Sequence, residues 1–171
     1  MRPDRARGFW ASFGYAGQGV WQTLRRQRNM RVHVSFVMAV AGLGWILGLG
    51  PTRWAVVVLA MVPVMGLELM NTAVEAVVDM ASPHYHPLAK VAKDAAAGSV
   101  LVAAAGAVAV GLWVFLPALA HFGPRFMVRW HENAALVVII GVALLAAYGV
   151  LWSWVPATKT NEGGQNRFGE Q

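Results

Sequence analysis

Acidic side chains are rare in this chain, and several of them gather in one apolar stretch. Only eight of the 171 residues are Asp or Glu, and four of these are Glu68, Glu75, Asp79 and Asp94. At about 100° per residue, Glu75 and Asp79 on a helix return to within about 20° of the direction of Glu68. With Asn71 and Thr72 beside this line, the side chains form a polar stripe on an otherwise apolar helix.

The polar stripe indicates a reactive site facing protein or water, because a carboxylate in a membrane span costs a few kcal/mol. A single buried acid is more often a structural ion-pair partner, but four together favour function. One carboxylate can accept a hydroxyl proton, and two others can hold Mg²⁺. Lys90 and Lys93 open the next helix, where free N–H groups favour phosphate. This set describes a phosphoryl-transfer site, although no GxxxxGK[ST] nucleotide loop is present.

Two other interpretations of these residues stay open. His84 and His86 flank Tyr85 and are either a metal-binding pair or plain solvated loop residues. The buried acids could also form a proton or ion relay. A relay predicts acids near the bilayer midplane on several broken helices, whereas here they lie mainly on one helix. The relay is therefore the weaker interpretation.

The elements that position the polar stripe are membrane helices. Hydrophobic residues make up 57% of the chain and charged residues 13%, with a mean hydropathy of +0.50. This composition excludes a disordered or nucleic-acid-binding chain. Spans of roughly 20 apolar residues are predicted at about 32–49, 54–78, 95–116 and 134–155. Pro63 is expected to kink the second span, and Gly44 and Gly48 are spaced for close helix packing.

A further helix is predicted before the first span. Its apolar residues fall three or four apart, at Phe9, Phe13, Ala16, Val20 and Leu24, and it closes on three arginines. This pattern favours an amphipathic helix lying on the membrane surface. The alternative is a helix packed against the bundle.

The distribution of basic residues predicts the orientation. Eleven Lys and Arg residues fall on the side of the N-terminus and three on the other side, so both termini are expected in the cytoplasm. Counted from Trp54, Glu68 lies about 21 Å along its helix, in the cytoplasmic third of the bilayer. The predicted organisation is a surface helix (1–31), a three-span core (32–117), an outer linker (118–133), a fourth span (134–156) and a cytoplasmic tail (157–171).

The polar stripe and the segment after it resemble the prokaryotic diacylglycerol kinase family. The run from Glu68 to Asp79 reads ELMNTAVEAVVD and matches the family's signature E-[LIM]-x-N-[ST]-A-[IV]-E-x-x-[VI]-D. It is followed by HPLAKVAKDAAAGSV, which starts at His86 and contains the family's A-K-D motif. Upstream, YAGQG at Tyr15 and RNMRVH at Arg28 also resemble the family. The resemblance covers about residues 9 to 117.

The resemblance implies an all-α, homotrimeric enzyme of the inner cell membrane that uses MgATP to phosphorylate a lipid alcohol at the cytoplasmic surface. By this resemblance, Glu68 is the catalytic base and Glu75 a metal ligand. The nucleotide would be contacted by Tyr15, Tyr85, His86, Lys93 and Asp94. The residues that bind the lipid or support the site would be Asn29, Arg31, Asn71 and Asp79.

One residue differs from the family's pattern, and the difference affects the predicted metal site. Where the family has a second metal-binding Glu, this chain has Gln27, whose amide oxygen can bind a cation but brings no charge. A catalytically weakened scaffold of the same fold is therefore one alternative. The local forms NTAVE and HPLAK resemble the undecaprenol kinase branch more than the diacylglycerol branch, so undecaprenol is the preferred substrate and diacylglycerol the alternative.

Overall fold

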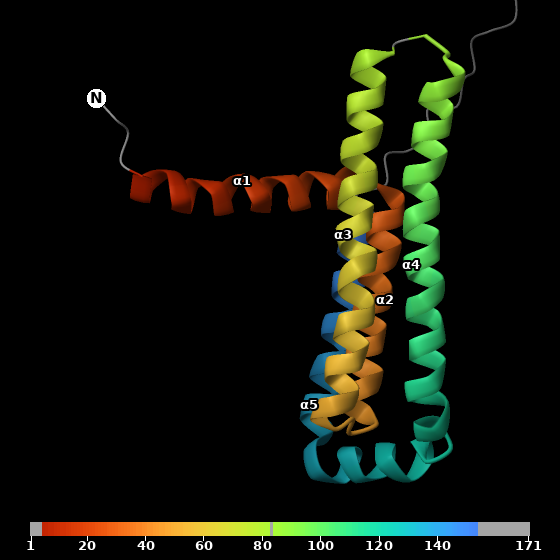
Figure 1. The fold of residues 1–171 in the computed structure, drawn as a ribbon. Helices are drawn as coiled ribbons and strands as arrows, with labels where there is room; N and C mark the ends of the chain where they lie inside the picture. Colours follow the sequence, from red (N-terminus) through yellow and green to blue (C-terminus); the bar gives the residue numbers. More distant parts are fainter. Residues whose placement is uncertain (1–4, 83, 154–171) are drawn as a thin grey trace, which may run out of the picture.

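The computed structural model describes residues 5–82 and 84–153, and in these ranges it is entirely helical. The helices are α1 (Arg5–Arg26), α2 (Arg28–Ile46), α3 (Pro51–Ala81), α4 (Pro87–Leu119) and α5 (Phe122–Ser153). Helices α2 to α5 are long and apolar enough to cross a membrane. Helix α1 leaves the bundle at a steep angle (Figure 1). The chain is thus a multi-pass membrane protein.

Proline and glycine set the helix ends. Pro51 and Pro87 occupy the first turns of α3 and α4, where a missing N–H costs nothing. His86 caps α4, because its Nδ1 accepts from the backbone N–H of Leu88 at 3.2 Å. Helix α2 ends because Gly48 adopts a φ of +62°, a conformation that favours glycine.

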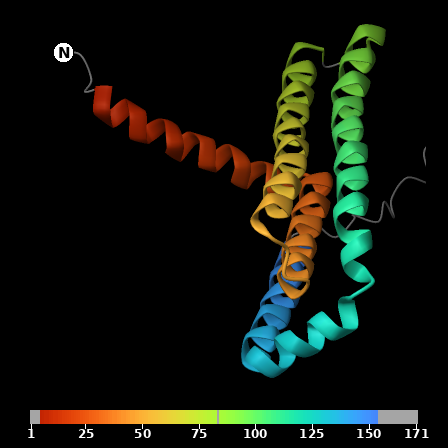
Figure 2. The same cartoon turned by 60° about the horizontal axis from the view of Figure 1, so that its bottom comes forward.

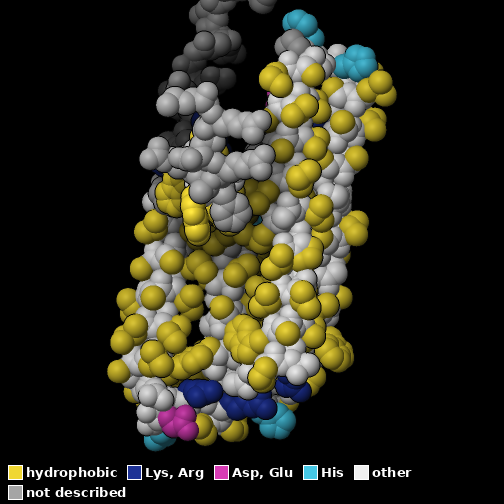
Figure 3. Space-filling model, turned by 60° about the vertical axis from the view of Figure 1, so that its left-hand side comes forward, with side chains coloured by type: hydrophobic (Ala, Val, Ile, Leu, Met, Phe, Trp, Pro, Cys, Tyr) yellow, Lys and Arg dark blue, Asp and Glu magenta, His cyan; other side chains and the backbone are white. Residues whose placement is uncertain are grey.

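The bundle is packed mainly at the end far from the polar stripe. Helices α3 and α4 form the most extensive pair. The end of α2, the start of α3 and the end of α4 meet in a buried cluster made of Leu47, Leu49, Val57, Val114, Phe115 and Ala118. Along the bundle most large apolar side chains are exposed, and Figure 3 shows a hydrophobic flank. A lipid-solvated bundle has this distribution, since the bilayer replaces water around the apolar side chains.

Helix α5 has two arms that meet at Asn133, where the backbone leaves the helical region (φ −151°, ψ 55°). The first arm, residues 122–132, crosses the end of the bundle, and the second runs back along α2 (Figures 1 and 2). Gly42 permits this contact, because a Cβ there would lie 2.8 Å from Leu144 Cδ1. The stretch expected as a linker is therefore largely helical.

The predicted spans differ from the helices at their ends. Helix α2 covers residues 28–46 rather than about 32–49, because the turn at Gly48 stops it early. Helix α4 passes through Pro117, which lies in its last turn, and continues to Leu119. Residues 154–156 of the fourth span, and the tail, lie outside the described residues.

The described side chains of α1 are mostly exposed, with Trp10 at 72% and Phe13 at 61%. The helix touches α2 and α3 but extends away from the bundle (Figures 1 and 2). The expected helix is present, and its position on a membrane surface stays a prediction.

Candidate active site

Two unpartnered oxygens are buried on α3. Glu68 is 1% exposed and Asn71 is 5% exposed. In the part of the chain that the structure describes, Glu68 Oε2 and Asn71 Oδ1 have no hydrogen-bond partner. Both residues line a pocket of about 240 Å³, which Asn29 also lines and which small residues of α4, such as Ala97, help to form. A buried polar oxygen without a partner is costly, and a hydrogen-bond donor placed in this pocket would remove that cost.

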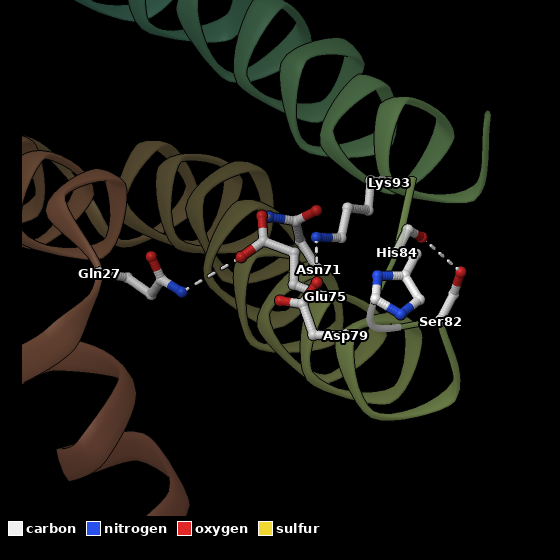
Figure 4. A network of polar contacts seen from close by, with 7 residues as sticks. All are labelled: Gln27, Asn71, Glu75, Asp79, Ser82, His84 and Lys93. Atoms are coloured by element: carbon white, nitrogen blue, oxygen red, sulfur yellow. Dashed lines mark hydrogen bonds and ion pairs between the residues drawn. The ribbon is translucent and has the colours of Figure 1, made fainter. Parts of the chain in front are cut away.

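Glu75 lies about one helical turn after Asn71 on α3. Its carboxylate accepts hydrogen bonds from two side-chain amides. Its Oε1 accepts from Asn71 Nδ2 at 3.1 Å and its Oε2 accepts from Gln27 Nε2 at 3.3 Å. Gln27 is the single residue between α1 and α2, so this bond ties the α1–α2 junction to α3 (Figure 4). Among the described residues no Lys or Arg forms an ion pair with Glu75. Its negative charge is therefore available to a cation.

Arg31 fixes the bend between α1 and α2. The side chain is 3% exposed, and its Nη1 donates to the carbonyl oxygen of Arg25 at 2.9 Å. Because the last carbonyls of a helix lack partners within it, this bond caps the end of α1. Arg31 thus ties α2 to the end of α1, across the junction at Gln27.

The exposed end of the polar stripe carries ion pairs. Asp79 pairs with Lys93 and so joins α3 to α4 (Figure 4), while Lys90 pairs with Asp94 along α4 itself. These groups are substantially exposed, so each pair contributes little to stability. Both lysines can therefore exchange a carboxylate for a phosphate at small cost.

The remaining predicted nucleotide contacts lie apart. Tyr85 is 82% exposed in the α3–α4 loop, beside the capping residue His86. Tyr15 is 71% exposed on α1, twelve residues or about 18 Å before Gln27 along the helix. Because α1 leads away from the bundle (Figure 1), this length of helix separates Tyr15 from the α1–α2 junction within one copy of the chain.

The donor atoms suit a hard cation. Glu68, Asn71 and Glu75 present carboxylate and amide oxygens, the ligands that Mg²⁺ prefers. The described residues contain no group of three or more His, Asp or Glu that could hold a metal alone. A cation held here would need further ligands, such as the substrate phosphates that Mg²⁺ commonly binds. The same finding leaves His84 and His86 without a third ligand in the described ranges.

An apolar groove continues from the pocket into the bundle. It has a volume of about 240 Å³ and lies between α2, α3 and α4. It shares Val32, His33 and Ala104 with the Glu68 pocket, and beyond them its walls are apolar side chains such as Phe36 and Met61. His33 was not among the predicted site residues. Its signal was a titratable side chain inside an apolar span, two residues after Arg31.

Comparisons with known proteins identify the family. The model of the family described as "Prokaryotic diacylglycerol kinase" matches residues 14–115. The chain is 43% identical to an undecaprenol kinase from Bacillus subtilis over 111 residues, covering 65% of this chain and 90% of that protein. It is 48% identical to a diacylglycerol kinase from Synechocystis sp. over 109 residues, covering 63% of this chain and 62% of that protein. No solved structure shows a significant match. The chain belongs to the prokaryotic diacylglycerol kinase family.

Proposed function

We propose that this lipid kinase transfers the γ-phosphate of ATP to the hydroxyl group of undecaprenol, giving undecaprenyl phosphate. The observation that carries the proposal is the unpartnered carboxylate of Glu68, buried where a polar pocket opens into an apolar groove. A lipid alcohol matches both parts, since its chain fits the groove and its hydroxyl group supplies the missing donor.

The chemistry follows from the different surroundings of the two glutamates. Glu68 Oε2 accepts the hydroxyl proton while the lipid oxygen bonds to the γ-phosphorus. The bond between this phosphorus and the β–γ bridging oxygen breaks, and ADP leaves. Asn71 orients Glu75 by its 3.1 Å hydrogen bond. Glu75 and Gln27 would hold Mg²⁺ once the Gln27 amide, whose Nε2 donates to Glu75 in this structure, turns its oxygen toward the cation. The ion would supply positive charge to neutralise the phosphate oxygens.

The nucleotide enters from the exposed end of the polar stripe. Lys93 and the first turn of α4 would bind its phosphates, with Asp79 as the group that Lys93 releases. His86, Tyr85 and Asp94 lie around this end and would contact the rest of the nucleotide. Tyr15 would reach it from the projecting α1 of another copy, in a homotrimer with shared sites.

The position of the proposed site along α3 supports a reaction at the membrane surface. The bond from Gln27 places Glu75 level with the α1–α2 junction, where a surface helix would meet the first span. Glu68 then lies about 10 Å deeper along α3. The excess of basic residues at this end supports a cytoplasmic location for the site and both termini in the inner cell membrane. Residues 32–117 would form the kinase core.

The substrate preference rests on the relatives. The Bacillus undecaprenol kinase is covered over 90% of its length, which supports undecaprenol. The Synechocystis diacylglycerol kinase, at 48% identity, supports diacylglycerol as the second candidate. The apolar lining of the groove does not distinguish the two lipids.

The test is transfer of labelled γ-phosphate from MgATP, by the purified chain in mixed micelles, to undecaprenol and diacylglycerol side by side. Label mainly in undecaprenyl phosphate is expected. Label mainly in phosphatidic acid would replace undecaprenol by diacylglycerol. No label in either lipid, from a folded oligomer, would identify a weakened member of the family and overturn the proposed activity.

A further inference from the structure

A second polar pocket lies at the end of the bundle opposite the candidate active site. Its volume is about 420 Å³. One wall is the turn after α2, at Leu47 and Gly48, and the other is the first arm of α5, with Arg125, Arg129 and Glu132. The arm lies beyond residue 115, where the match to the kinase family ends. The pocket therefore includes a part of this chain that the shared kinase core lacks.

Arg125 has no acidic partner among the described residues. Its Nη1 donates to the carbonyl oxygen of Leu47 at 2.8 Å and so caps the end of α2. Among the described residues no carboxylate pairs with it. A guanidinium group has five N–H donors, and one hydrogen bond leaves most of them for a ligand.

Arg129 lies one turn after Arg125 on the same face of the arm. Its guanidinium lies 5.4 Å from the centre of the Trp45 ring, and its Nη1 lies 3.6 Å from Glu132 Oε2. The Glu132 side chain is 54% exposed, so this ion pair is weak. The pocket thus holds two guanidinium groups against one exposed carboxylate, and it favours an anion.

The aromatic residues of the first arm of α5 indicate that the pocket lies at the depth of lipid headgroups. The arm carries three stacked aromatic rings, with Phe122 and Phe126 5.8 Å apart and Phe126 and Trp130 6.1 Å apart. Such aromatic residues are typical of the membrane–water interface. Figure 3 shows Lys and Arg side chains gathered at this end, below a hydrophobic flank.

We propose that this pocket binds the phosphate of an anionic phospholipid in the leaflet opposite the active site. Arg125 and Arg129 would hold the phosphate by charge-assisted hydrogen bonds. The apolar walls at Ile46, Pro124 and Val128 would contact the glycerol and acyl carbons, which a free phosphate lacks. The bound lipid would fix the first arm of α5 on the turn after α2.

The experiment is native mass spectrometry of the full chain with phosphatidylglycerol, phosphatidylcholine of the same acyl chains, or inorganic phosphate. Phosphatidylglycerol is expected to bind about tenfold more tightly than phosphatidylcholine, since only its phosphate is free of a compensating cation. Arg129→Gln should weaken this binding about tenfold. Arg53→Gln is the matched control, because Arg53 is exposed at the same end but does not line the pocket.

Two further variants separate binding from folding. Arg125→Lys keeps a charged donor for Leu47 but loses the guanidinium fork, and it should also weaken phosphatidylglycerol binding. Glu132→Gln removes the competing carboxylate and should tighten binding severalfold. Unchanged binding in Arg129→Gln and Glu132→Gln, or equal loss in Arg53→Gln, would overturn the proposal. Displacement of the lipid by equimolar inorganic phosphate would overturn the lipid as the ligand.

Discussion

Glu68 and Glu75 lie seven residues apart on one face of α3, yet their surroundings differ. Glu68 has a buried oxygen without a partner in the described chain, whereas both oxygens of Glu75 accept hydrogen bonds from amides. A proton acceptor needs a free oxygen near its substrate, and a metal ligand needs a fixed carboxylate. The two environments therefore suit the two different roles proposed for them.

Replacing Glu68 by Gln tests the proposed base. The amide has nearly the same shape but cannot accept the hydroxyl proton, so the rate of phosphate transfer should fall by about 10²- to 10⁴-fold. Labelled transfer to lipid measures the rate, and size-exclusion chromatography checks that the oligomer is intact. Glu162→Gln, outside the shared kinase core, should leave the rate unchanged. A Glu68→Gln enzyme with near-normal activity would remove Glu68 as the base.

Replacing Gln27 by Glu tests the proposed metal site. Without Mg²⁺ the new carboxylate would face Glu75, since the Gln27 amide lies 3.3 Å from it, and the melting temperature should fall through like-charge repulsion. Mg²⁺ should restore the melting temperature. The Mg²⁺ concentration needed for half-maximal phosphate transfer should drop about tenfold, because the affinity of a site for Mg²⁺ rises with the negative charge of its ligands.

Gln18→Glu is the control for this change, because it adds the same charge at an exposed position of α1. Its melting temperature should not depend on Mg²⁺. If Gln27→Glu behaves in the same way as this control, position 27 is not a metal ligand.

Sequence periodicity was sufficient to place the polar stripe but not its partners. The helical repeat brings Glu68, Asn71 and Glu75 to one face, and the structure has them there. The bond from Gln27 and the position of His33 on two pockets depend on how α1 and α2 meet and on how α2 packs against α3. Such long-range geometry has no local signal in the sequence.

The elements differ most from expectation at the end of α2. The spacing of Gly44 and Gly48 predicted a pair for close helix packing. Gly44 does have a close neighbour, because a Cβ there would lie 2.7 Å from Trp54 Cη2. Gly48 instead follows the helix and adopts a positive φ, so that Leu49 N–H donates to the Gly44 carbonyl oxygen at 3.0 Å. A glycine's neighbours alone do not distinguish these two roles.

Gly48→Ala should lower the free energy of unfolding by about 1 kcal/mol, because its φ of +62° is unfavourable for a residue with a Cβ. The added methyl group would also lie 3.4 Å from Arg129 Nη2. Thermal melting in detergent measures the change. Gly141→Ala, in an open position of α5, should be neutral or stabilising. Equal stability of the two variants would contradict a structural role for the Gly48 turn.

At the scale of the molecule, the number of spans was predictable and their assembly was not. Apolar length alone gave four candidate spans, and the structure has four helices that qualify. The course of α5 depends on the break at Asn133 and on the contact of Gly42 with Leu144. These are tertiary features, which the hydrophobicity of the individual spans does not encode.

Shared sites between copies can be tested by mixing variants. Tyr15→Ala copies should have a raised KM for ATP, and Glu68→Gln copies should be inactive. In a 1:1 coexpressed trimer, about a quarter of the sites would combine an intact Tyr15 with an intact Glu68 from a different copy. Activity at low ATP should therefore exceed that of either variant alone or of the two mixed after purification. No gain would show that Tyr15 does not act across copies.

The orientation of the whole bundle is predicted from charge, and the absence of cysteine from the sequence makes it measurable. His84 lies in the loop between α3 and α4, and Gly123 lies on the first arm of α5, so that α4 separates them. Because eleven of the fourteen basic residues fall on the side of the N-terminus and of His84, that side should face the cytoplasm.

A membrane-impermeant maleimide added to spheroplasts should label Gly123→Cys at once. It should label His84→Cys only after permeabilisation. The reverse pattern would place the active site outside the cell, where ATP is scarce, and would contradict the proposed kinase reaction. Labelling of both positions from the same side would show that α4 does not cross the membrane.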